Sequence, residues 1–425
     1  MLAHSRPMSN HELATQFFLQ MAVILAACRL TGWVMARLGQ SQVVSEMIAG
    51  VLLGPSLLGW LAPDLSAALF PANGTPLLYV VAQIGLVLYM FVVGCEFDLG
   101  QLRQRLGAAA SVSAAGILAP FGLGALLAWG LVQTPGYFGT GISPLLAMLF
   151  MGAAMSITAF PMLARIIHEQ GLARSPLGTL ALAAGAIDDA VAWCVLAVVL
   201  ALLRQDAAVA YLALGGAAGY ALLCLGLLRP LLAPLGRVVQ TRGLQPGPFV
   251  GVLLLLMLGA WFTDFIQIYA VFGAFLMGLA MPRGQLTEAL QQRIEPLTRS
   301  LLLPVFFTYS GLHTQIQLVN TATLWGLAAL VLLAAVAGKG LACYAAARWH
   351  GYAPREALAV GTLMNARGLM ELIILNIGLQ AGIITAPLFT LMVLMAIVTT
   401  LMASPVFRRL YPPQPTILPA PGHPV

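Results

Sequence analysis

Two neighbouring aspartates, Asp188 and Asp189, lie at the midpoint of the segment 175–203, which contains no other charged residue. As a helix, a segment of this length crosses the roughly 30 Å apolar core of a bilayer. Each acid at the centre of such a helix costs roughly 2.5 to 3.5 kcal/mol to insert, so an acid that remains there is a functional candidate. Its carboxylate can bind a proton or a small cation. The two exclude each other, because a protonated acid coordinates a cation only weakly.

The overall composition is that of a membrane protein. Apolar residues make up 60% of the chain, charged residues make up 8%, and the mean hydropathy is +0.93, values that soluble domains do not reach. The first apolar run is too long for a signal peptide and lacks a small-residue cleavage site, so we expect it to be retained. The five cysteines show no paired spacing and are interpreted as small core residues, not as disulfide or zinc ligands.

Apolar runs of the length that a spanning helix needs predict an all-α integral membrane protein with about thirteen transmembrane helices. The ninth and tenth runs are short. We expect one transmembrane domain over residues 1–406 and a short Pro-rich cytoplasmic tail over 407–425, which is predicted to be disordered. The thirteen runs lie near 14–36, 42–60, 76–95, 107–132, 144–167, 176–203, 208–233, 248–266, 268–282, 298–313, 322–347, 356–379 and 384–406.

The arginines predict the orientation of these runs, because cytoplasmic loops are enriched in basic residues. Sixteen of the nineteen arginines fall on one set of alternate loops or in the C-terminal segment, whereas Arg6 and Arg204 fall on the other side and Arg367 lies inside a run. The N-terminus is therefore predicted outside and the C-terminus in the cytoplasm, in a cell membrane such as the bacterial inner membrane. Loop arginines that face an anionic leaflet also explain the net charge of +6, so no nucleic-acid partner is expected. The sixteen are Arg29, Arg37, Arg103, Arg105, Arg165, Arg174, Arg229, Arg237, Arg242, Arg283, Arg293, Arg299, Arg348, Arg355, Arg408 and Arg409.

The single lysine, Lys339, lies in the eleventh run with no other charge between Trp325 and Arg348. A buried ammonium needs a counter-ion, and a central aspartate is the expected partner. Because successive helical residues point about 100° apart, Asp188 and Asp189 cannot both face the same neighbour. One is expected to pair with Lys339 while the other faces a cavity. A purely structural ion pair is the alternative, but it leaves the second acid without a partner.

Two runs are interrupted at similar depth. Run five contains Pro161, which removes a backbone donor and frees a carbonyl in mid-membrane, and run twelve contains Arg367, Gly368 and Glu371. Glu371 is expected to pair with Arg367 and neutralise that break. The two runs are seven apart, an odd offset that reverses orientation, so we predict an inverted repeat of helices 1–6 and 8–13 with helix 7 as linker. Two discontinuous helices would then cross, and their freed carbonyls would complete an oxygen shell around a cation.

Seven sequence blocks, in order, resemble the monovalent cation:proton antiporters, within the branch that holds glutathione-gated potassium efflux proteins and plant cation/proton exchangers. The similarity extends from residue 41 to residue 406. The blocks are VVSEMIAGVLLGPSLLG at 43–59, FVVGCEFD at 91–98, SITAFPMLARII at 156–167, AGAIDDAVAW at 184–193, FGAFLMGLAMP at 272–282, LPVFFTYSGL at 303–312 and NARGLMELIILNIG at 365–378.

The resemblance implies a sodium/hydrogen exchanger-type, NhaA-like transmembrane domain that forms a homodimer, each protomer having a dimerisation domain and a mobile core domain. It assigns the cation- and proton-carrying carboxylate to Asp189, the second acid to Asp188, the partner of that acid to Lys339, and the unwound crossing of helix five to Thr158. The two acids and Thr158 are thus the expected ligands of the transported cation. The chain has no counterpart of the efflux proteins' nucleotide-binding domain, so gating by nucleotide is not expected.

Together these residues predict a secondary active transporter, not an enzyme, that exchanges Na⁺ or K⁺ for protons by alternating access and needs no cofactor. Exchange would be electrogenic if Asp188 also releases a proton. The alternative is a cation channel or gated potassium efflux pathway on the same scaffold, without obligatory proton coupling. An intramembrane aspartyl protease needs its acids on separate helices and a Gly-x-Gly-Asp signature that this sequence lacks. The spacing of these residues along the sequence does not distinguish Na⁺, K⁺ and Li⁺. It also leaves the proton stoichiometry and the direction of transport open.

The remaining acidic residues are predicted to have lesser roles. Glu46, Glu96, Asp98 and Asp264 lie at or near the ends of runs, where a solvated or interfacial position is expected. His168 and Glu169 lie in a predicted cytoplasmic loop, where they are candidate pH sensors but more simply loop residues.

Overall fold

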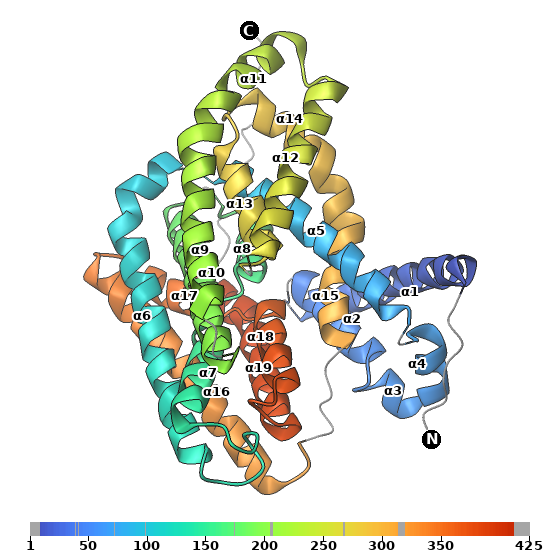
Figure 1. The fold of residues 1–425 in the computed structure, drawn as a ribbon, viewed down its shortest axis with the longest axis vertical. Helices are drawn as coiled ribbons and strands as arrows, with labels where there is room; N and C mark the ends of the chain where they lie inside the picture. Colours follow the sequence, from blue (N-terminus) through green and yellow to red (C-terminus); the bar gives the residue numbers. More distant parts are fainter. Residues whose placement is uncertain are drawn as a thin grey trace.

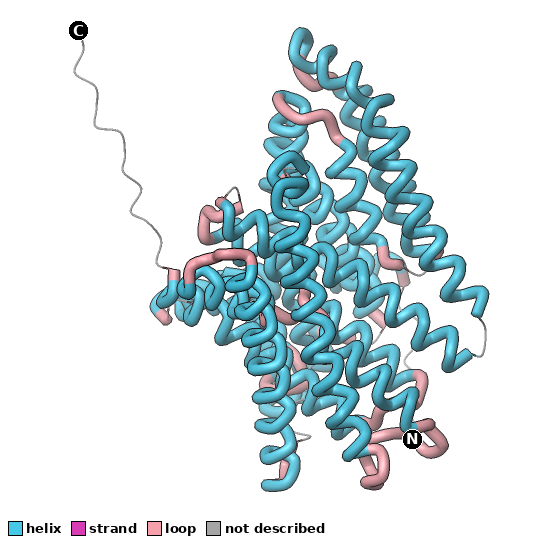
Figure 2. Tube along the Cα trace, turned by 90° about the vertical axis from the view of Figure 1, so that its left-hand side faces the viewer, coloured by secondary structure: helices cyan, strands magenta, loops and turns pink. Residues whose placement is uncertain are grey.

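The computed structural model describes residues 9–38, 40, 42–71, 73–97, 99–173, 175–204, 207–266, 268–312 and 319–411. Within these ranges the chain is helical apart from turns, short extended stretches and one isolated bridge between Phe138 and Ile384 (Figure 2). The predicted all-α fold is therefore confirmed. Eight described segments are long and apolar enough to cross a membrane. The helix that carries both aspartates, Pro176–Arg204, is 29 residues long, or about 44 Å, which is also sufficient.

Most helices belong to one of two groups, within which most of the packing occurs (Figure 1). The flanking group consists of α1 (Asn10–Arg37), α2 (Gln42–Leu53), α5 (Thr75–Glu96), α11 (Arg229–Arg242), α12 (Pro246–Phe265), α13 (Ala270–Ala280), α14 (Gln285–Leu297), η2 (Thr298–Leu302) and α15 (Leu303–Leu312). The acid-bearing group consists of α6 (Leu99–Leu131), α7 (Pro144–Ser156), α8 (Phe160–Glu169), α9 (Pro176–Arg204), α16 (Ala322–Trp349), α17 (Pro354–Met364), α18 (Leu369–Gln380) and α19 (Ala386–Leu410). The short α3 (Leu58–Leu61) and α4 (Pro63–Leu69) follow α2, and α10 (Ala207–Leu222) with η1 (Leu223–Leu228) connects the groups.

The helix boundaries differ from the predicted runs at several places. The second run divides into α2 and α3, and α14 is an amphipathic helix outside the predicted spans. The last helix continues to Leu410, so the first four residues of the predicted tail are helical. Residues 412–425 lie outside the described chain, and the division into domain and tail stays a prediction. The count of thirteen spans, their orientation and the inverted repeat stay predictions.

Glycines allow the flanking helices to cross at backbone contact. A Cβ atom at Gly94 of α5 would collide with the carbonyl oxygen of Phe275 on α13, and one at Gly278 of α13 would collide with that of Phe91 on α5. Each glycine therefore removes the side chain that would separate the two helices. Gly50 of α2 is placed in the same way against the backbone of α15. Such contacts leave little freedom for α2, α5, α13 and α15 to shift past one another.

Both interrupted helices of the acid-bearing group begin with ordinary N-terminal signals. The Ser143 hydroxyl accepts a hydrogen bond from Leu146 N at 3.3 Å, with Pro144 in the first turn of α7. At the start of α17, Ala353 N donates to Glu356 Oε2 at 3.1 Å, again with a proline in the first turn. Capping groups of this kind satisfy orphan backbone donors. The first halves of both broken helices are thus specified locally, and only their inner ends need tertiary partners.

We expect Gly278→Ala to destabilise the protein by about 1 to 3 kcal/mol, because the added methyl group has no room between α13 and α5. The matched control is Gly251→Ala in α12, where a Cβ atom would meet nothing within 4 Å. The measurement is the thermal midpoint of each detergent-solubilised variant. Equal midpoints for Gly278→Ala and wild type would show that α5 and α13 are not in backbone contact.

Candidate functional site

Two helix breaks meet inside the acid-bearing group. The first break, residues 157–159, separates α7 from α8, and the second, residues 365–368, separates α17 from α18. Ala159 N donates to Ala366 O at 3.0 Å, so the two non-helical stretches lie against each other. Pro161 lies in the first turn of α8, where its missing N–H leaves no helical bond unmade. The sequence located both breaks correctly, and the hydrogen bond shows where they cross.

Lys339 of α16 forms an ion pair with the first aspartate of α9. Its Nζ lies 3.0 Å from Asp188 Oδ2, and both side chains are fully buried. The same ammonium donates to the carbonyl oxygen of Gly116 on α6, at 3.0 Å, and to that of Ser156 at the end of α7. An ammonium has three protons to donate, and each has an acceptor here. Desolvation opposes burial of this charge, and the complete set of partners offsets it.

Thr158, in the break after α7, binds the same carboxylate oxygen. Its hydroxyl lies 2.6 Å from Asp188 Oδ2 and 3.2 Å from Met364 O. A hydroxyl has one proton, and the shorter distance to a charged acceptor favours donation to the aspartate. Asp188 Oδ2 thus accepts from both Lys339 and Thr158, while its Oδ1 has no hydrogen-bond partner among the described residues.

Asp189 points elsewhere, as the helical step of about 100° requires. Its side chain is buried, with 4% of the residue exposed, and Oδ1 has no hydrogen-bond partner in the described chain. The two buried basic side chains nearby, Lys339 and Arg367, form ion pairs with Asp188 and Glu371 instead. The adjacent acids on α9 therefore have different surroundings, because Asp188 is ion-paired and Asp189 Oδ1 is without a partner among the described residues.

Arg367 and Glu371 lie at the second break and are fully buried, with Arg367 Nη1 3.4 Å from Glu371 Oε1. The guanidinium also donates to Ala154 O at 3.2 Å and to Met155 O at 2.6 Å. Together with Lys339 on Ser156 O, two cations bind the carboxyl end of α7. They neutralise the negative end of that half-helix.

These contacts correct one expectation. The carbonyls at the end of α7 were expected to form part of a cation's oxygen shell, but those of Ala154, Met155 and Ser156 already accept hydrogen bonds from basic side chains. A carbonyl bound by a guanidinium or an ammonium is a poor cation ligand, because the positive charges repel. For these three carbonyls the expectation is wrong.

The position of Glu46 was also predicted wrongly. It is fully buried on α2 instead of interfacial, and its Oε1 accepts from Gln42 Nε2 at 2.9 Å. Its electrostatic neighbour is Arg165 of α8. A residue near the end of an apolar run is therefore not necessarily exposed, because another helix can cover it. Asp264 is exposed, as expected, whereas Asp98 lies outside the described residues.

His168, predicted to lie in a loop, is in the last turn of α8, with its Nε2 2.8 Å from Glu96 Oε2 of α5. Both line a cavity of about 360 Å³ between the two groups, on the arginine-rich side. Leu182 of α9 also lines it, seven residues before Asp189 and about 10 Å from it along the helix axis. The cavity therefore reaches from the predicted cytoplasmic side to within two turns of the second aspartate.

Sequence reasoning missed Thr400 of α19. Its hydroxyl donates to Arg367 O at 2.7 Å and accepts from Arg367 N at 3.2 Å, so it holds the backbone of the second break. The available signal was the pair of adjacent threonines, Thr399 and Thr400, inside a mostly apolar run. No cluster of three His, Cys, Asp or Glu side chains that would suit a resident metal occurs in the described chain.

We expect Lys339→Ala to destabilise the protein by about 3 to 5 kcal/mol, because it leaves Asp188 buried without its counter-ion. The double variant Asp188→Asn with Lys339→Gln should recover much of that loss. Arg237→Ala removes an exposed cation from α11 and serves as control. The measurement is the thermal midpoint in detergent, and a Lys339→Ala midpoint equal to that of wild type would contradict the ion pair.

Known proteins share this architecture and much of the sequence. The transmembrane family described as sodium/hydrogen exchanger matches residues 22–411. The Na⁺/H⁺ antiporter NhaS4 of Synechocystis is 42% identical over 92% of this chain and 96% of its own length. Cation/H⁺ antiporter 17 of Arabidopsis thaliana (36%) and K⁺/H⁺ antiporter 1 of Saccharomyces cerevisiae (32%) are also similar, but the chain spans only about half of their lengths, 48% and 46%.

Among solved structures, the sodium proton antiporter MjNhaP1 of Methanocaldococcus jannaschii aligns with a TM-score of 0.59 at 15% identity, over 92% of this chain and 96% of that chain. At that identity the likeness concerns the fold alone. The resemblance to monovalent cation:proton antiporters, drawn above from seven sequence blocks, is confirmed by the family match and the relatives. The chain therefore belongs to the sodium/hydrogen exchanger family of multi-pass membrane proteins.

Proposed function

We propose that this protein is a secondary transporter that exchanges a monovalent cation, Na⁺ or K⁺, for protons by alternating access. The observation that carries the proposal is the contrast between two adjacent buried acids. Asp188 is bonded to Lys339 and Thr158, whereas Asp189 Oδ1 has no hydrogen-bond partner among the described residues. The relatives named as Na⁺/H⁺, K⁺/H⁺ and cation/H⁺ antiporters support the same activity.

Competition at Asp189 is sufficient to couple the two fluxes. A protonated carboxyl and a carboxylate with a bound monovalent cation are both neutral, whereas the empty carboxylate carries a buried charge. Moving that charge through the apolar part of the protein is expensive. If only the two neutral forms cross, each cation that moves one way requires a proton to move the other way.

Asp188 and Lys339 are proposed to supply a second proton. When a cation binds beside the ion pair, the balance of charge changes, and Asp188 or Lys339 can exchange a proton as the bridge rearranges. Two protons per cation would make the cycle electrogenic. The membrane potential would then act on the cycle with about 2.3 kcal/mol per charge and 100 mV.

We further propose that the two helix groups are the moving parts, in a homodimer with the N-terminus outside and the C-terminus in the cytoplasm. The flanking group is interlocked by glycine contacts and suits a fixed scaffold. The acid-bearing group contains both breaks, both aspartates and their basic partners, so it can carry the site as one unit. The arrangement of arginines on alternate loops supports the orientation.

A channel on the same scaffold is the second candidate that the sequence raised. It predicts cation flux without a coupled change of internal pH. The deciding assay uses purified protein in liposomes that contain a pH-sensitive dye, with Na⁺, K⁺ and Li⁺ added outside in turn. Cation entry at constant internal pH would favour the channel and contradict exchange.

Asp189→Asn should abolish exchange of every cation in this assay while leaving a folded protein, because an amide neither carries the proton nor neutralises the ion. Asp64→Asn is the matched control, since Asp64 is an exposed aspartate on α4. Thermal midpoints of both variants, compared with wild type, report folding. A cation-driven pH change that persists in Asp189→Asn liposomes would overturn the assignment of the carrier.

Electrogenic exchange should respond to an imposed membrane potential. Initial rates are compared at several potentials, set with an ionophore that is selective for an ion other than the substrate. The double variant Asp188→Asn with Lys339→Gln keeps one titrating group, so any residual exchange should be insensitive to potential. Wild-type rates that are independent of potential would show one-for-one exchange and leave Asp188 as a structural partner of Lys339.

A further inference from the structure

Thr400 of α19 bonds more than its own helix. A buried threonine inside a helix commonly bonds a carbonyl three or four residues back, as Thr399 does with Met395 O at 2.9 Å and Ala396 O at 3.0 Å. Thr400 Oγ1 also lies 2.8 Å from Ala396 O, but it bonds both backbone groups of Arg367 as well. Both threonines are fully buried. The difference between their described hydrogen bonds is therefore the contact of Thr400 with the second break.

The Thr400 hydroxyl fixes the direction of the peptide group that joins Ala366 to Arg367. Arg367 N donates to Thr400 Oγ1 at 3.2 Å, and Ala366 O accepts from Ala159 N at 3.0 Å. The N–H and C=O of one planar trans peptide group point in opposite directions, so an N–H that is held toward α19 aims the carbonyl at the first break. The next peptide group is held too, because Arg367 O accepts from the same hydroxyl at 2.7 Å.

The first break connects this peptide group to the aspartates of α9. The residue before Ala159 is Thr158, whose hydroxyl lies 2.6 Å from Asp188 Oδ2. Hydrogen bonds and peptide groups therefore form an unbroken chain from Thr400 through both breaks to Asp188. Asp188 directly precedes Asp189 on the same helix. The position of the breaks relative to both acids thus depends on directional contacts that begin at α19.

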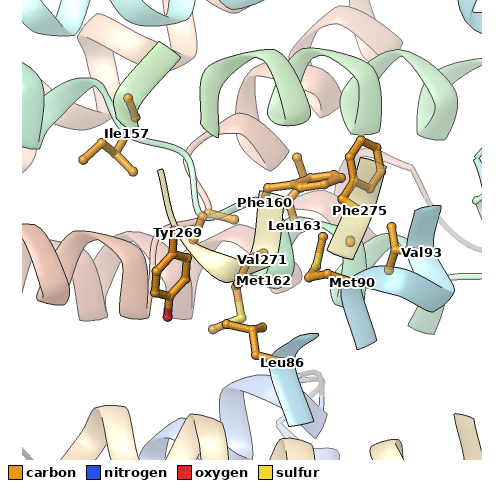
Figure 3. Close-up of a cluster of buried hydrophobic side chains, with 14 of the residues drawn as sticks. Leu86, Met90, Val93, Ile157, Phe160, Met162, Leu163, Tyr269, Val271 and Phe275 are labelled. Atoms are coloured by element: carbon orange, nitrogen blue, oxygen red, sulfur yellow. The ribbon is translucent and has the colours of Figure 1, made fainter. Parts of the chain in front are cut away.

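Apolar contacts alone would hold the first break less strictly. Figure 3 shows Phe160 and Met162, which follow the break, in a buried cluster with Phe275 of α13. The rings of Phe160 and Phe275 meet edge to face with centroids 5.0 Å apart. The free energy of apolar burial does not depend on direction, whereas a hydrogen bond weakens steeply when its angle changes. The orientation of the crossing therefore depends on its hydrogen bonds.

We propose that Thr400 is a positioning residue for the transport site, because its hydroxyl holds the second break and thereby fixes Thr158 relative to the two aspartates. The inference rests on the proposed exchange and adds a residue from a helix that supplies none of the proposed cation ligands. Loss of the hydroxyl frees the peptide group between Ala366 and Arg367, and the crossing then adopts a wider range of positions. Ligands that are not held in place bind a cation more weakly, so the apparent affinity falls for every transported cation.

The test compares Thr400→Val with the matched control Thr399→Val in liposomes that contain a pH dye. Valine has nearly the shape of threonine, so each variant loses little more than a hydroxyl. Half-saturating cation concentrations and maximal rates are measured with Na⁺, K⁺ and Li⁺. We expect Thr400→Val to raise the half-saturating concentrations about two- to tenfold, the effect of one lost hydrogen bond, and to change the maximal rate less. Thr399→Val should match wild type, and Thr400→Ser, which keeps a hydroxyl, should restore the wild-type values.

Thermal midpoints in detergent report whether each variant folds. If Thr400→Val does not fold, Thr400→Cys decides the question, because a thiol is only a weak donor and acceptor. Half-saturating concentrations that stay at the wild-type values in the folded variant overturn this inference, and so does an equal rise in Thr399→Val. Exchange by the wild-type protein leaves the proposed function intact in both cases. A wild-type protein that exchanges no cation overturns both the inference and the proposed function.

Discussion

The ion pair between Lys339 and Asp188 organises the rest of the site. One ammonium connects four helices, because it binds the carboxylate on α9, the Gly116 carbonyl on α6 and the Ser156 carbonyl that ends α7, while it is itself carried by α16. A buried charge tolerates no missing partner, so these helices must meet in this geometry or leave a charge uncompensated. This contact also requires the first helix break, because the Ser156 carbonyl lacks a helical N–H partner only where α7 ends.

Charge balance then distinguishes the two aspartates. Asp188 is compensated by Lys339, and Glu371 by Arg367, with both cations also bound to the end of α7. The four charges cancel, and Asp189 Oδ1 is left without a hydrogen-bond partner among the described residues. In the exchange proposed above, the charge of Asp189 would be balanced in turn by a proton and by a monovalent cation. A permanent basic partner would prevent that alternation.

Much of the fold and of the candidate site could be predicted from the residues themselves. The features that could not be predicted were missed for physical reasons. A lone lysine in an apolar run and two acids in another predict a buried pair, and Pro161 and Gly368 predict breaks, because burial of charge and loss of a backbone donor are local requirements. Which carbonyls Arg367 and Lys339 bind is a tertiary property, so the sequence did not show that three carbonyls at the end of α7 already have cationic partners. Glu46 was misplaced for the same reason, since its burial depends on the packing of other helices against α2.

The contacts between the two groups differ along the interface in a way that suits movement. At the arginine-rich end they are polar, with Gln42 N donating to Glu169 Oε2 at 3.1 Å and His168 Nε2 lying 2.8 Å from Glu96 Oε2. In the middle they are apolar, as between Phe160 and Phe275. The free energy of an apolar contact is roughly proportional to the buried area and does not depend on direction. Apolar side chains that slide past one another would therefore exchange one such contact for another. In the movement proposed above, the polar end would lose hydrogen bonds on opening, and water could replace them because the cavity between the groups lies there. The barrier to that movement would then be concentrated at the polar end.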